Sequence, residues 1–227
     1  MLQQPKTSGL TRDPRAASSR NLRKHTSGNP LERWLLRRFH RTVVALAEEA
    51  IGPDDTPSIL EVGCGEGFVL RVLRDRWPQA RLCGVDYSGS ALAWAARQVA
   101  ASLVRGDAGR LPVRTASAPF VIGAEVLEHL PDPQAALTEI ARVAKPLSPA
   151  GRAFVLFTVP HQPWFSVANL LRGKNWSNWG DDLEHLWRWT PSQFLALIGE
   201  RFEVRSVRYS FPWLLALSEV RGPQGER

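Results

Sequence analysis

The sequence contains little cysteine, no long apolar run and no excess of either charge over most of its length. Only two of its 227 residues are cysteines, Cys64 and Cys83, and they form no CxxC pair. We interpret them as reduced packing residues of a cytoplasmic protein, because they fit neither a disulfide framework nor a zinc site. No stretch of 18 apolar residues occurs, and residues 1–30 have no apolar signal-peptide core, so neither a membrane span nor secretion is expected.

The positive charge is concentrated near the N-terminus. Residues 1–30 contain six lysines and arginines against one acid, whereas the other 197 residues contain 23 basic and 21 acidic side chains. A domain that binds DNA or RNA needs a basic surface to contact the phosphate backbone. The nearly neutral remainder of the chain provides none, so nucleic acid is not the expected partner.

Two segments precede the predicted core. Residues 1–28 are rich in serine, arginine, proline and glycine, and we expect a disordered basic tail there, with an organellar transit peptide as the alternative. Residues 29–50 place apolar side chains at helical spacing behind a predicted N-cap, Asn29, and Pro30. This amphipathic helix is expected to pack on its own domain, while peripheral contact with an anionic membrane through its arginine-rich face stays open.

From residue 58 onward, short apolar runs alternate with helical stretches. The pattern predicts strands at 58–63, 80–86, 102–106, 119–125 and 151–159, and helices at 67–77, 89–101 and 132–145. Alternation of this kind is typical of a parallel sheet covered by helices on both faces.

The C-terminal part closes this sheet. After a tryptophan-rich insert at 161–190, a helix is predicted behind the N-cap Thr190, and strands follow at 202–209 and 213–221. Because so few residues connect these two strands, we expect them to pair antiparallel at one edge of the sheet. We therefore predict an α/β fold with a Rossmann-like, doubly wound, mostly parallel seven-stranded sheet and an antiparallel edge hairpin, in one domain over 29–227.

The most informative segment is SILEVGCGEGF, residues 58–68. An acid, Glu61, lies near the end of an apolar strand, and Gly63, Gly65 and Gly67 follow at every second position. Glycines allow tight backbone angles and let bare backbone approach a ligand. Because ligands of parallel sheets bind at the carboxyl ends of the strands, this segment predicts a ligand site.

The next two predicted strands also lead into acids. Asp86 lies 19 residues past Gly67, where a carboxylate accepts hydrogen bonds from both hydroxyls of a ribose. Tyr87, which follows directly, is suited to pack on a purine, and Asp107 after the third strand is suited to accept a hydrogen bond from an exocyclic amine. Three carboxylates at three strand ends therefore indicate a nucleoside ligand.

The charge of the first acid discriminates between nucleosides. A dinucleotide site uses G-x-G-x-x-G and rests a pyrophosphate on a helix N-terminus, whereas this loop is G-x-G-x-G with Glu61 two positions before its first glycine. Negative charge there repels phosphate and favours a cation. S-adenosylmethionine, with an ammonium, a sulfonium and an adenosine, matches all three acids. The alternative from another enzyme class is a nicotinamide-dependent oxidoreductase. Its dinucleotide would need space for phosphate groups at the position of Glu61.

Four segments in this order resemble the successive motifs of class I S-adenosylmethionine-dependent methyltransferases: LEVGCGEGF, GVDYS, GDAGRLP and AEVLEHLPDP. The similarity runs from about residue 56 to 221, with one departure, Ala118 and Pro119, where the family usually has Phe-Asp before the fourth strand. It implies that the loop with Glu61 holds the methionine part of the cofactor, Asp86 the ribose and Asp107 the adenine. The residues that the resemblance assigns to the cofactor are Glu61, Gly63, Cys64, Gly65, Gly67, Asp86, Tyr87, Gly106, Asp107, Ala108 and Glu125.

Acceptor-side candidates cluster just beyond the predicted fourth strand. A hydroxyl acceptor needs a base or a metal to remove its proton, and we predict Glu125, His129 and His185 as the residues that orient the acceptor or take this proton. Similarity to quinone-pathway and small-RNA O-methyltransferases, whose related ExxEH run binds a divalent metal, implies metal ligands at Glu125, Glu128, His129 and His185. We nevertheless predict that these side chains mainly shape the pocket, as in metal-free members of the family, and keep metal binding as the alternative.

The insert at 161–190 indicates the kind of acceptor. It contains five of the nine tryptophans, and inserts at this place commonly cover the acceptor in this fold, although each tryptophan alone is more often a packing residue. We predict O-methylation of a small or lipid-like hydroxyl compound, with C- or N-methylation or an inactive cofactor-binding scaffold as alternatives. The sequence predicts no oligomeric state.

Overall fold

The computed structural model describes Leu22, His25 and residues 27–51, 56–144, 151–161 and 185–221. Most of the predicted tail and residues 162–184 of the predicted insert lie outside these ranges. The elements in chain order are α2 (Pro30–Ala50), β1 (Ser58–Val62), α3 (Phe68–Arg76), β2 (Arg81–Asp86), α4 (Gly89–Ala95), β3 (Ser102–Arg105), β4 (Phe120–Ala124), η1 (Leu127–His129), α5 (Pro133–Ala144), β5 (Phe154–Pro160), α7 (Pro191–Gly199), β6 (Phe202–Ser210) and β7 (Trp213–Val220).

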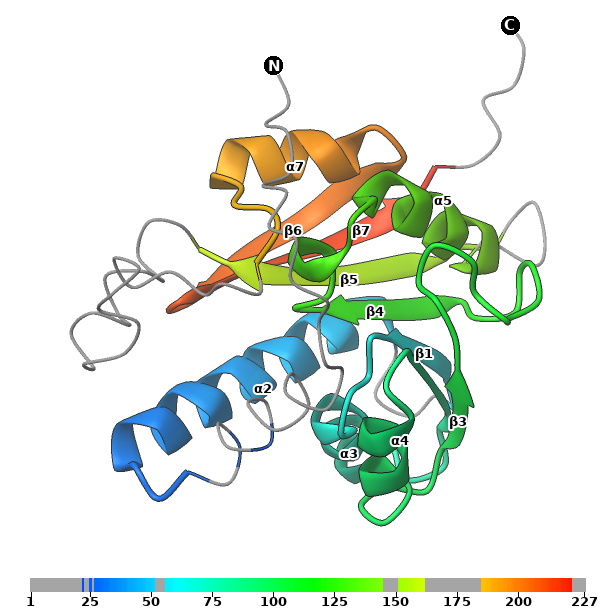
Figure 1. Cartoon of the computed structure of the whole chain (residues 1–227). Coiled ribbons are helices and arrows are strands. Elements are labelled where there is room, and N and C mark those ends of the chain that lie inside the picture. Colours follow the sequence, from blue (N-terminus) through cyan, green and yellow to red (C-terminus); the bar gives the residue numbers. More distant parts are fainter. Residues whose placement is uncertain are drawn as a thin grey trace, which may run out of the picture.

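All seven strands form one sheet in the order β3-β2-β1-β4-β5-β7-β6 (Figure 1). The first five strands in this order are parallel to their neighbours, whereas β7 runs antiparallel to both β5 and β6. The chain builds outward from β1 to β3 and then crosses to β4 on the other side of β1, so the strand order reverses between β1 and β4. Parallel sheets place their ligands at such a reversal. The predicted doubly wound sheet with an antiparallel edge hairpin is confirmed.

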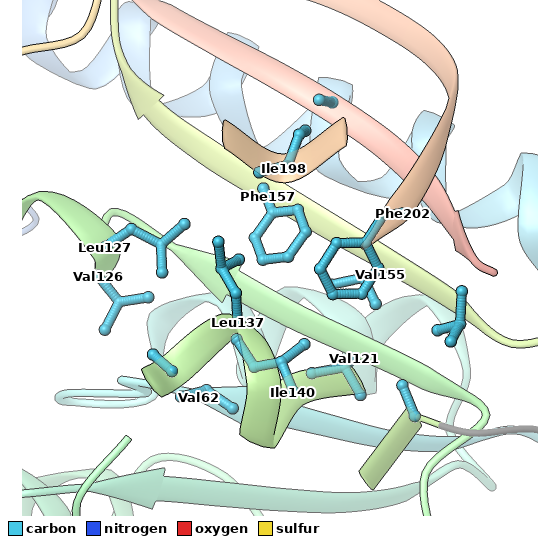
Figure 2. Close-up of a cluster of buried hydrophobic side chains, with 14 of the residues drawn as sticks. Val62, Val121, Val126, Leu127, Leu137, Ile140, Val155, Phe157, Ile198 and Phe202 are labelled. Carbon is cyan, nitrogen blue, oxygen red and sulfur yellow. The ribbon is translucent and has the colours of Figure 1, made fainter. Parts of the chain in front are cut away.

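Helices cover both faces of the sheet. Helices α2, α3 and α4 lie on one face, and α5 and α7 lie on the other (Figure 1). Figure 2 shows the core under α5 and α7, where Leu137 and Ile198 pack with Phe157 and Phe202, whose ring centroids are 5.2 Å apart. The second core lies under α2 and α3. Two apolar layers fix the positions of the strand ends.

The helix predicted over 29–50 is present as α2. Its N-cap is Asn29, whose side chain accepts a hydrogen bond from the Leu31 N–H at 2.9 Å. The buried face carries Phe39, whose ring centroid lies 4.8 Å from that of Trp213 on β7. The helix therefore packs on its own domain. None of the described helices is both long and apolar enough to cross a membrane.

Two local details differ from or refine the predictions. The helix predicted over 89–101 ends at Ala95, because the chain turns toward β3, where the Arg74 guanidinium donates to the Ala100 carbonyl at 2.6 Å. The departure at Ala118 and Pro119 leaves β4 intact. Ala118 is buried and donates its N–H to the Val143 carbonyl at 3.2 Å, and β4 begins at Phe120.

Candidate functional site

A buried acid lies at the reversal point of the sheet. Glu61 on β1 is 2% exposed, and its Oε2 has no hydrogen-bond partner in the described part of the chain. Burial raises the pKa of Glu61 well above its usual 4.5; a backbone hydrogen bond from Leu70 opposes this rise and the nearby Asp86 adds to it. Glu61 lines a cavity of about 80 Å³, together with His25, Leu36, Phe39, Gly63, Cys64, Phe68, Val69, Ala124, Glu125 and Trp213. A cationic ligand group in this cavity would compensate the buried carboxylate.

The three glycines of the loop adopt backbone angles that favour glycine. Gly63, Gly65 and Gly67 have φ of 73°, 50° and 77°. A Cβ on Gly63 would lie 2.6 Å from a methyl group of Val126, and one on Gly67 would lie 3.0 Å from the Cβ of Ala95. The backbone must therefore be bare for the packing of the protein itself, and not only for the approach of a ligand.

Asp86 ties the loop to the end of β2. Its Oδ2 accepts a hydrogen bond from the Gly65 N–H and its Oδ1 accepts one from the Ser88 N–H, both at 2.7 Å. Each carboxylate oxygen can accept more than one hydrogen bond, so Asp86 can still accept hydrogen bonds from ribose hydroxyls. The sequence predicted only the ligand role; the structure adds that Asp86 positions the loop.

The end of β3 lies beside the end of β2, as the Gly106 N–H donates to the Asp86 carbonyl at 3.0 Å. Tyr87 is 63% exposed, and the Arg105 guanidinium lies 5.5 Å above its ring. Asp107 is exposed and accepts a hydrogen bond from the Gly109 N–H at 2.8 Å. The roles predicted for Tyr87, Asp107 and the half-buried Ala108 toward an adenine stay predictions.

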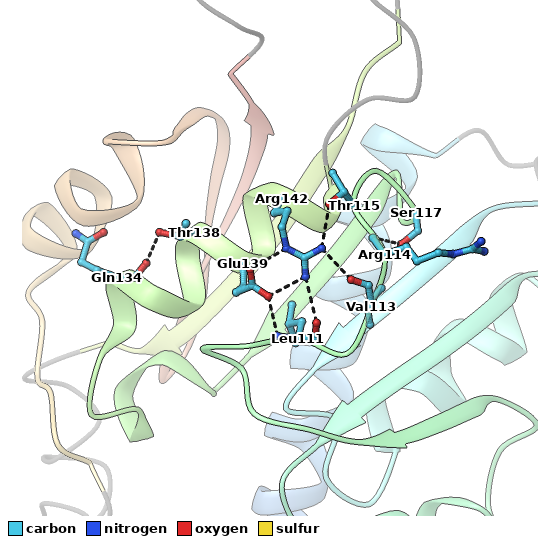
Figure 3. A network of polar contacts seen from close by, with 9 residues as sticks. All are labelled: Leu111, Val113, Arg114, Thr115, Ser117, Gln134, Thr138, Glu139 and Arg142. Atoms are coloured by element: carbon cyan, nitrogen blue, oxygen red, sulfur yellow. Dashed lines mark hydrogen bonds and ion pairs between the residues drawn. The ribbon is translucent and has the colours of Figure 1, made fainter.

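The loop after Asp107 is hydrogen-bonded to side chains of α5 (Figure 3). The Arg142 guanidinium donates to the carbonyls of Leu111 and Val113 at 3.1 and 2.9 Å, and Glu139 accepts a hydrogen bond from the Leu111 N–H at 2.8 Å. The hydrogen bond from Arg142 lowers the pKa of Glu139. The sequence analysis did not identify this pair, although its i,i+3 spacing on a predicted helix was a signal.

Glu125 enters the same cavity as Glu61 from the end of β4. It has a positive φ of 53°, and its N–H donates to both the carbonyl and the Oγ1 of Thr158 on β5, each at 3.1 Å. A non-glycine residue in this conformation carries backbone strain, which is enriched at functional sites. The prediction that places Glu125 beside the ligand site is consistent with this position.

Three of the four candidate metal ligands, named as the alternative to a metal-free pocket, come together. Ligand atoms of Glu128, His129 and His185 lie within 4.8 Å of one another, and the two imidazole rings are 4.9 Å apart between centroids. The backbone N–H of Leu186 donates to the Glu128 carbonyl at 2.8 Å, which docks the segment 185–190 on η1. Glu125 is not part of this group, and neither histidine lines the Glu61 cavity within the described residues.

The tryptophans of the insert separate into two sets. Trp164, Trp176 and Trp179 lie outside the described residues. Trp189 is 8% exposed and packs in the core beside Phe194, so for this residue the packing alternative holds. Trp187 stacks on Trp189 with ring centroids 5.9 Å apart.

His25 is a cavity residue that the sequence analysis did not single out, and it lies within the predicted tail. Its ring stacks on Phe68 with centroids 3.8 Å apart, and His40 of α2 lies 5.6 Å from it. Burial, with Arg71 nearby, lowers the pKa of His40 to about 4, so His40 is neutral at pH 7. No motif or spacing in the sequence signals that His25 contacts the loop.

Known proteins resemble this chain in sequence. A family model described as a methyltransferase domain matches residues 60–149. Malonyl-[acyl-carrier protein] O-methyltransferase of Hahella chejuensis is 28% identical over 191 residues, which cover 80% of this chain and 63% of that protein. A probable S-adenosylmethionine-dependent methyltransferase of Mycolicibacterium smegmatis is 32% identical over 136 residues, covering 60% of this chain and 49% of that protein. The match thus spans less than two thirds of the length of either of these two relatives.

Solved structures agree on the fold. The crystal structure of magnesium protoporphyrin IX methyltransferase from Synechocystis PCC 6803 with bound SAH superposes with a TM-score of 0.67 at 14% identity. The superposition covers 91% of this chain and 95% of that one. At this identity the likeness concerns the fold alone.

Proposed function

We propose that this chain, which belongs to the class I S-adenosylmethionine-dependent methyltransferase family, transfers a methyl group from that cofactor to the oxygen of a small or lipid-like hydroxyl compound. The observation that carries the proposal is the buried carboxyl group of Glu61 in a cavity at the reversal point of the sheet. A buried acid without a hydrogen-bond partner on Oε2 suits a cationic amino-acid group and disfavours a diphosphate.

The predicted cofactor residues suit the parts of S-adenosylmethionine. Glu61 lines the cavity in which the positively charged group would bind, and Asp86 offers acceptors at the adjacent strand end. When bound, this cofactor supplies a methyl group activated by a sulfonium. Transfer of that group needs no protein nucleophile, so the main task of the residues around the cavity is to position the two reactants.

The acceptor oxygen must lose a proton during transfer, and Glu125, His129 and His185 are the proposed residues for its orientation or deprotonation. Support for Glu125 comes from its place in the cavity that Glu61 lines. Support for oxygen as the acceptor atom comes from the relative whose name contains O-methyltransferase. Methylation at carbon or nitrogen stays the alternative within the family.

A divalent cation is part of the proposal. One carboxylate and two imidazoles, from Glu128, His129 and His185, are a donor set that suits manganese, iron or zinc. Such an ion would supply a Lewis acid for the acceptor hydroxyl. Titration of the protein with Mn²⁺, followed by electron paramagnetic resonance, tests the site directly. We expect binding in the parent protein and its loss in His185→Gln, and no binding to either protein would refute the metal site.

Incubation of the purified chain with methyl-labelled S-adenosylmethionine and fractionated cell extract tests the activity. We expect the label in a methyl ether, with strongly reduced transfer by Glu61→Gln at limiting cofactor concentration. Label on carbon or nitrogen would refute the acceptor atom but not the family activity. The cytoplasmic location predicted from the sequence stays a prediction, which the free thiols of Cys64 and Cys83 support.

A further inference from the structure

Exposed apolar side chains gather at one end of the molecule. Five large hydrophobic side chains are exposed among the described residues, and four of them lie on α2 or at the β6–β7 turn. Leu31 and Trp34 on α2 are 51% and 49% exposed, and Tyr209 and Phe211 at the turn are 52% and 41% exposed. Scattered single exposures are ordinary in folded proteins, whereas a cluster of this kind marks an interaction site.

The four side chains belong to one continuous surface. The Arg38 guanidinium lies 5.7 Å from the centre of the Trp34 ring. Arg38 also lines a surface hollow of about 420 Å³ together with His161, Tyr209 and Phe211. Arg38 thus joins α2 to the turn, and Figure 1 shows α2 alongside the β6–β7 hairpin. We call this region the arginine–aromatic surface, defined by Leu31, Trp34, Tyr209, Phe211 and the exposed arginines of α2.

Helix geometry explains why these side chains point outward. The buried stripe of α2 contains Leu35, Phe39 and Val43, and residues three and four apart share a face of a helix. Arg33, Arg37 and Arg41 follow one another at intervals of four, and all three are exposed. The buried face of α2 therefore packs on the core, whereas its outer face carries arginines together with a tryptophan and a leucine.

The charge of this surface is not balanced. Neither Arg38 nor the other three exposed arginines form an ion pair within the part of the chain that the structure describes. Residues 1–41 contain ten lysines and arginines against two acids, a net charge of +8, whereas residues 42–227 have a net charge of −1. The entire positive excess of the chain thus resides in residues 1–41, which include the α2 part of this surface.

We infer that the arginine–aromatic surface docks the protein on an anionic lipid bilayer. Arginines attract anionic headgroups, each basic side chain near such a surface contributing about 1 kcal/mol, while tryptophan and tyrosine favour the headgroup level. The inner side of the same helix, at Leu36 and Phe39, lines the Glu61 cavity. Docking would bring that cavity to the bilayer, and the further consequence that a lipid-like acceptor is collected there rests on the proposed function.

Co-sedimentation of the full chain with vesicles of phosphatidylcholine, with and without phosphatidylglycerol, tests the docking. We expect binding to the anionic vesicles only, and its loss as the salt concentration rises. The triple variant Arg33→Gln, Arg37→Gln, Arg41→Gln should weaken the partition constant about 100-fold. The double variant Leu31→Ser, Trp34→Ser should weaken it about 10-fold.

A matched control separates this surface from net charge. The triple variant Arg81→Gln, Arg97→Gln, Arg114→Gln removes the same charge from exposed positions outside α2, and we expect a change below about twofold. Equal losses in both triple variants, or equal binding to neutral vesicles, would overturn the proposal. Retention of the chain on immobilised polyglutamate without sedimentation with vesicles would assign the surface to an acidic protein and likewise overturn it.

The test also distinguishes the docking from the proposed function. The substituted arginines do not line the Glu61 cavity, so the α2 triple variant should bind S-adenosylhomocysteine as the parent protein does. If the parent protein binds the cofactor but not the vesicles, the docking alone is refuted. Intact vesicle binding without cofactor binding would refute the proposed function alone.

Discussion

The proposed cofactor side and the proposed acceptor side of the site are built in different ways. On the cofactor side, at the ends of β1, β2 and β3, positive-φ glycines and backbone N–H groups bonded to Asp86 determine the geometry. On the acceptor side, His185 reaches His129 only because a segment far along the chain docks on η1. The first side depends on local backbone rules and the second on long-range packing. This contrast predicts where substitutions act.

The largest effect is expected at Gly63. Gly63→Ala places a Cβ 2.6 Å from Val126 at a φ of 73°, which should destabilise the fold by about 3 kcal/mol through overpacking and strain. Urea denaturation measures the change. Gly199→Ala is the control: nothing lies within 4 Å of its Cβ and it ends helix α7, so it should be neutral or stabilising. Equal costs at both glycines would contradict the role of packing in the loop.

Glu61→Gln should have the next largest effect. Removing one partner of a buried charge pair costs about 2–5 kcal/mol, so affinity for S-adenosylmethionine should fall about 100-fold. Calorimetric titration measures it. The free variant should be folded, since glutamine has the same shape. An affinity within about threefold of the parent protein would show that no cationic group meets this position.

Glu61 also predicts the pH dependence of binding. In the free protein, burial raises the pKa of Glu61 and so favours its protonated form, whereas a bound ammonium favours the carboxylate. Binding should therefore release a proton and tighten as the pH rises through that pKa. The same shift means that the stability of the free protein falls as the pH rises through it. Titration in buffers of different ionisation enthalpy measures the release, which Glu61→Gln should abolish.

An effect of about 2 kcal/mol is expected at Arg142, which anchors the loop that follows Asp107. Arg142→Ala removes the donors to the Leu111 and Val113 carbonyls and should lower the free energy of unfolding. Arg152→Ala is the control, because Arg152 is exposed and its partner Glu219 on β7 keeps its ion pair with Arg205, so this change should cost clearly less than Arg142→Ala. If the two variants cost the same, the loop is held by something other than Arg142.

Asp86→Ala should weaken cofactor binding about tenfold, about 1.4 kcal/mol. Part of the loss would come from the loop, since Asp86 accepts the Gly65 N–H at 2.7 Å. Asp86→Asn keeps one oxygen acceptor and should lose less. Binding of S-adenosylhomocysteine and of homocysteine separates the loss of a ribose contact from the displacement of the loop, because only S-adenosylhomocysteine has a ribose. Unchanged affinity for S-adenosylhomocysteine would contradict the ribose assignment.

The smallest effect on cofactor binding is expected on the acceptor side. His185→Gln should change the affinity for S-adenosylhomocysteine less than about twofold, below about 0.4 kcal/mol, because His185 does not line the Glu61 cavity. Methyl transfer, measured with labelled cofactor, should fall strongly. Large losses of cofactor affinity in this variant would show that the two sides are not separate.

The same contrast explains what the sequence could predict. The sheet and the acids at its strand ends were predictable, because glycine spacing and the order of apolar runs are local signals, as at Gly63 and Asp86. The contact of His25 with Phe68 was not, since no periodicity marks it. The i,i+3 pair Glu139–Arg142 was visible, but its purpose depends on a loop that packs against α5 only after folding.

In the proposed function, the acid at the end of β1 selects a cationic nucleoside over a diphosphate. Calorimetric titration of the parent chain and of Glu61→Gln, each with S-adenosylhomocysteine and with reduced nicotinamide dinucleotide, measures this selectivity. We predict binding of S-adenosylhomocysteine to the parent chain, a loss of about 100-fold in the variant, and no measurable binding of the dinucleotide to the parent chain. Tighter binding of the dinucleotide than of S-adenosylhomocysteine would contradict the proposed selectivity.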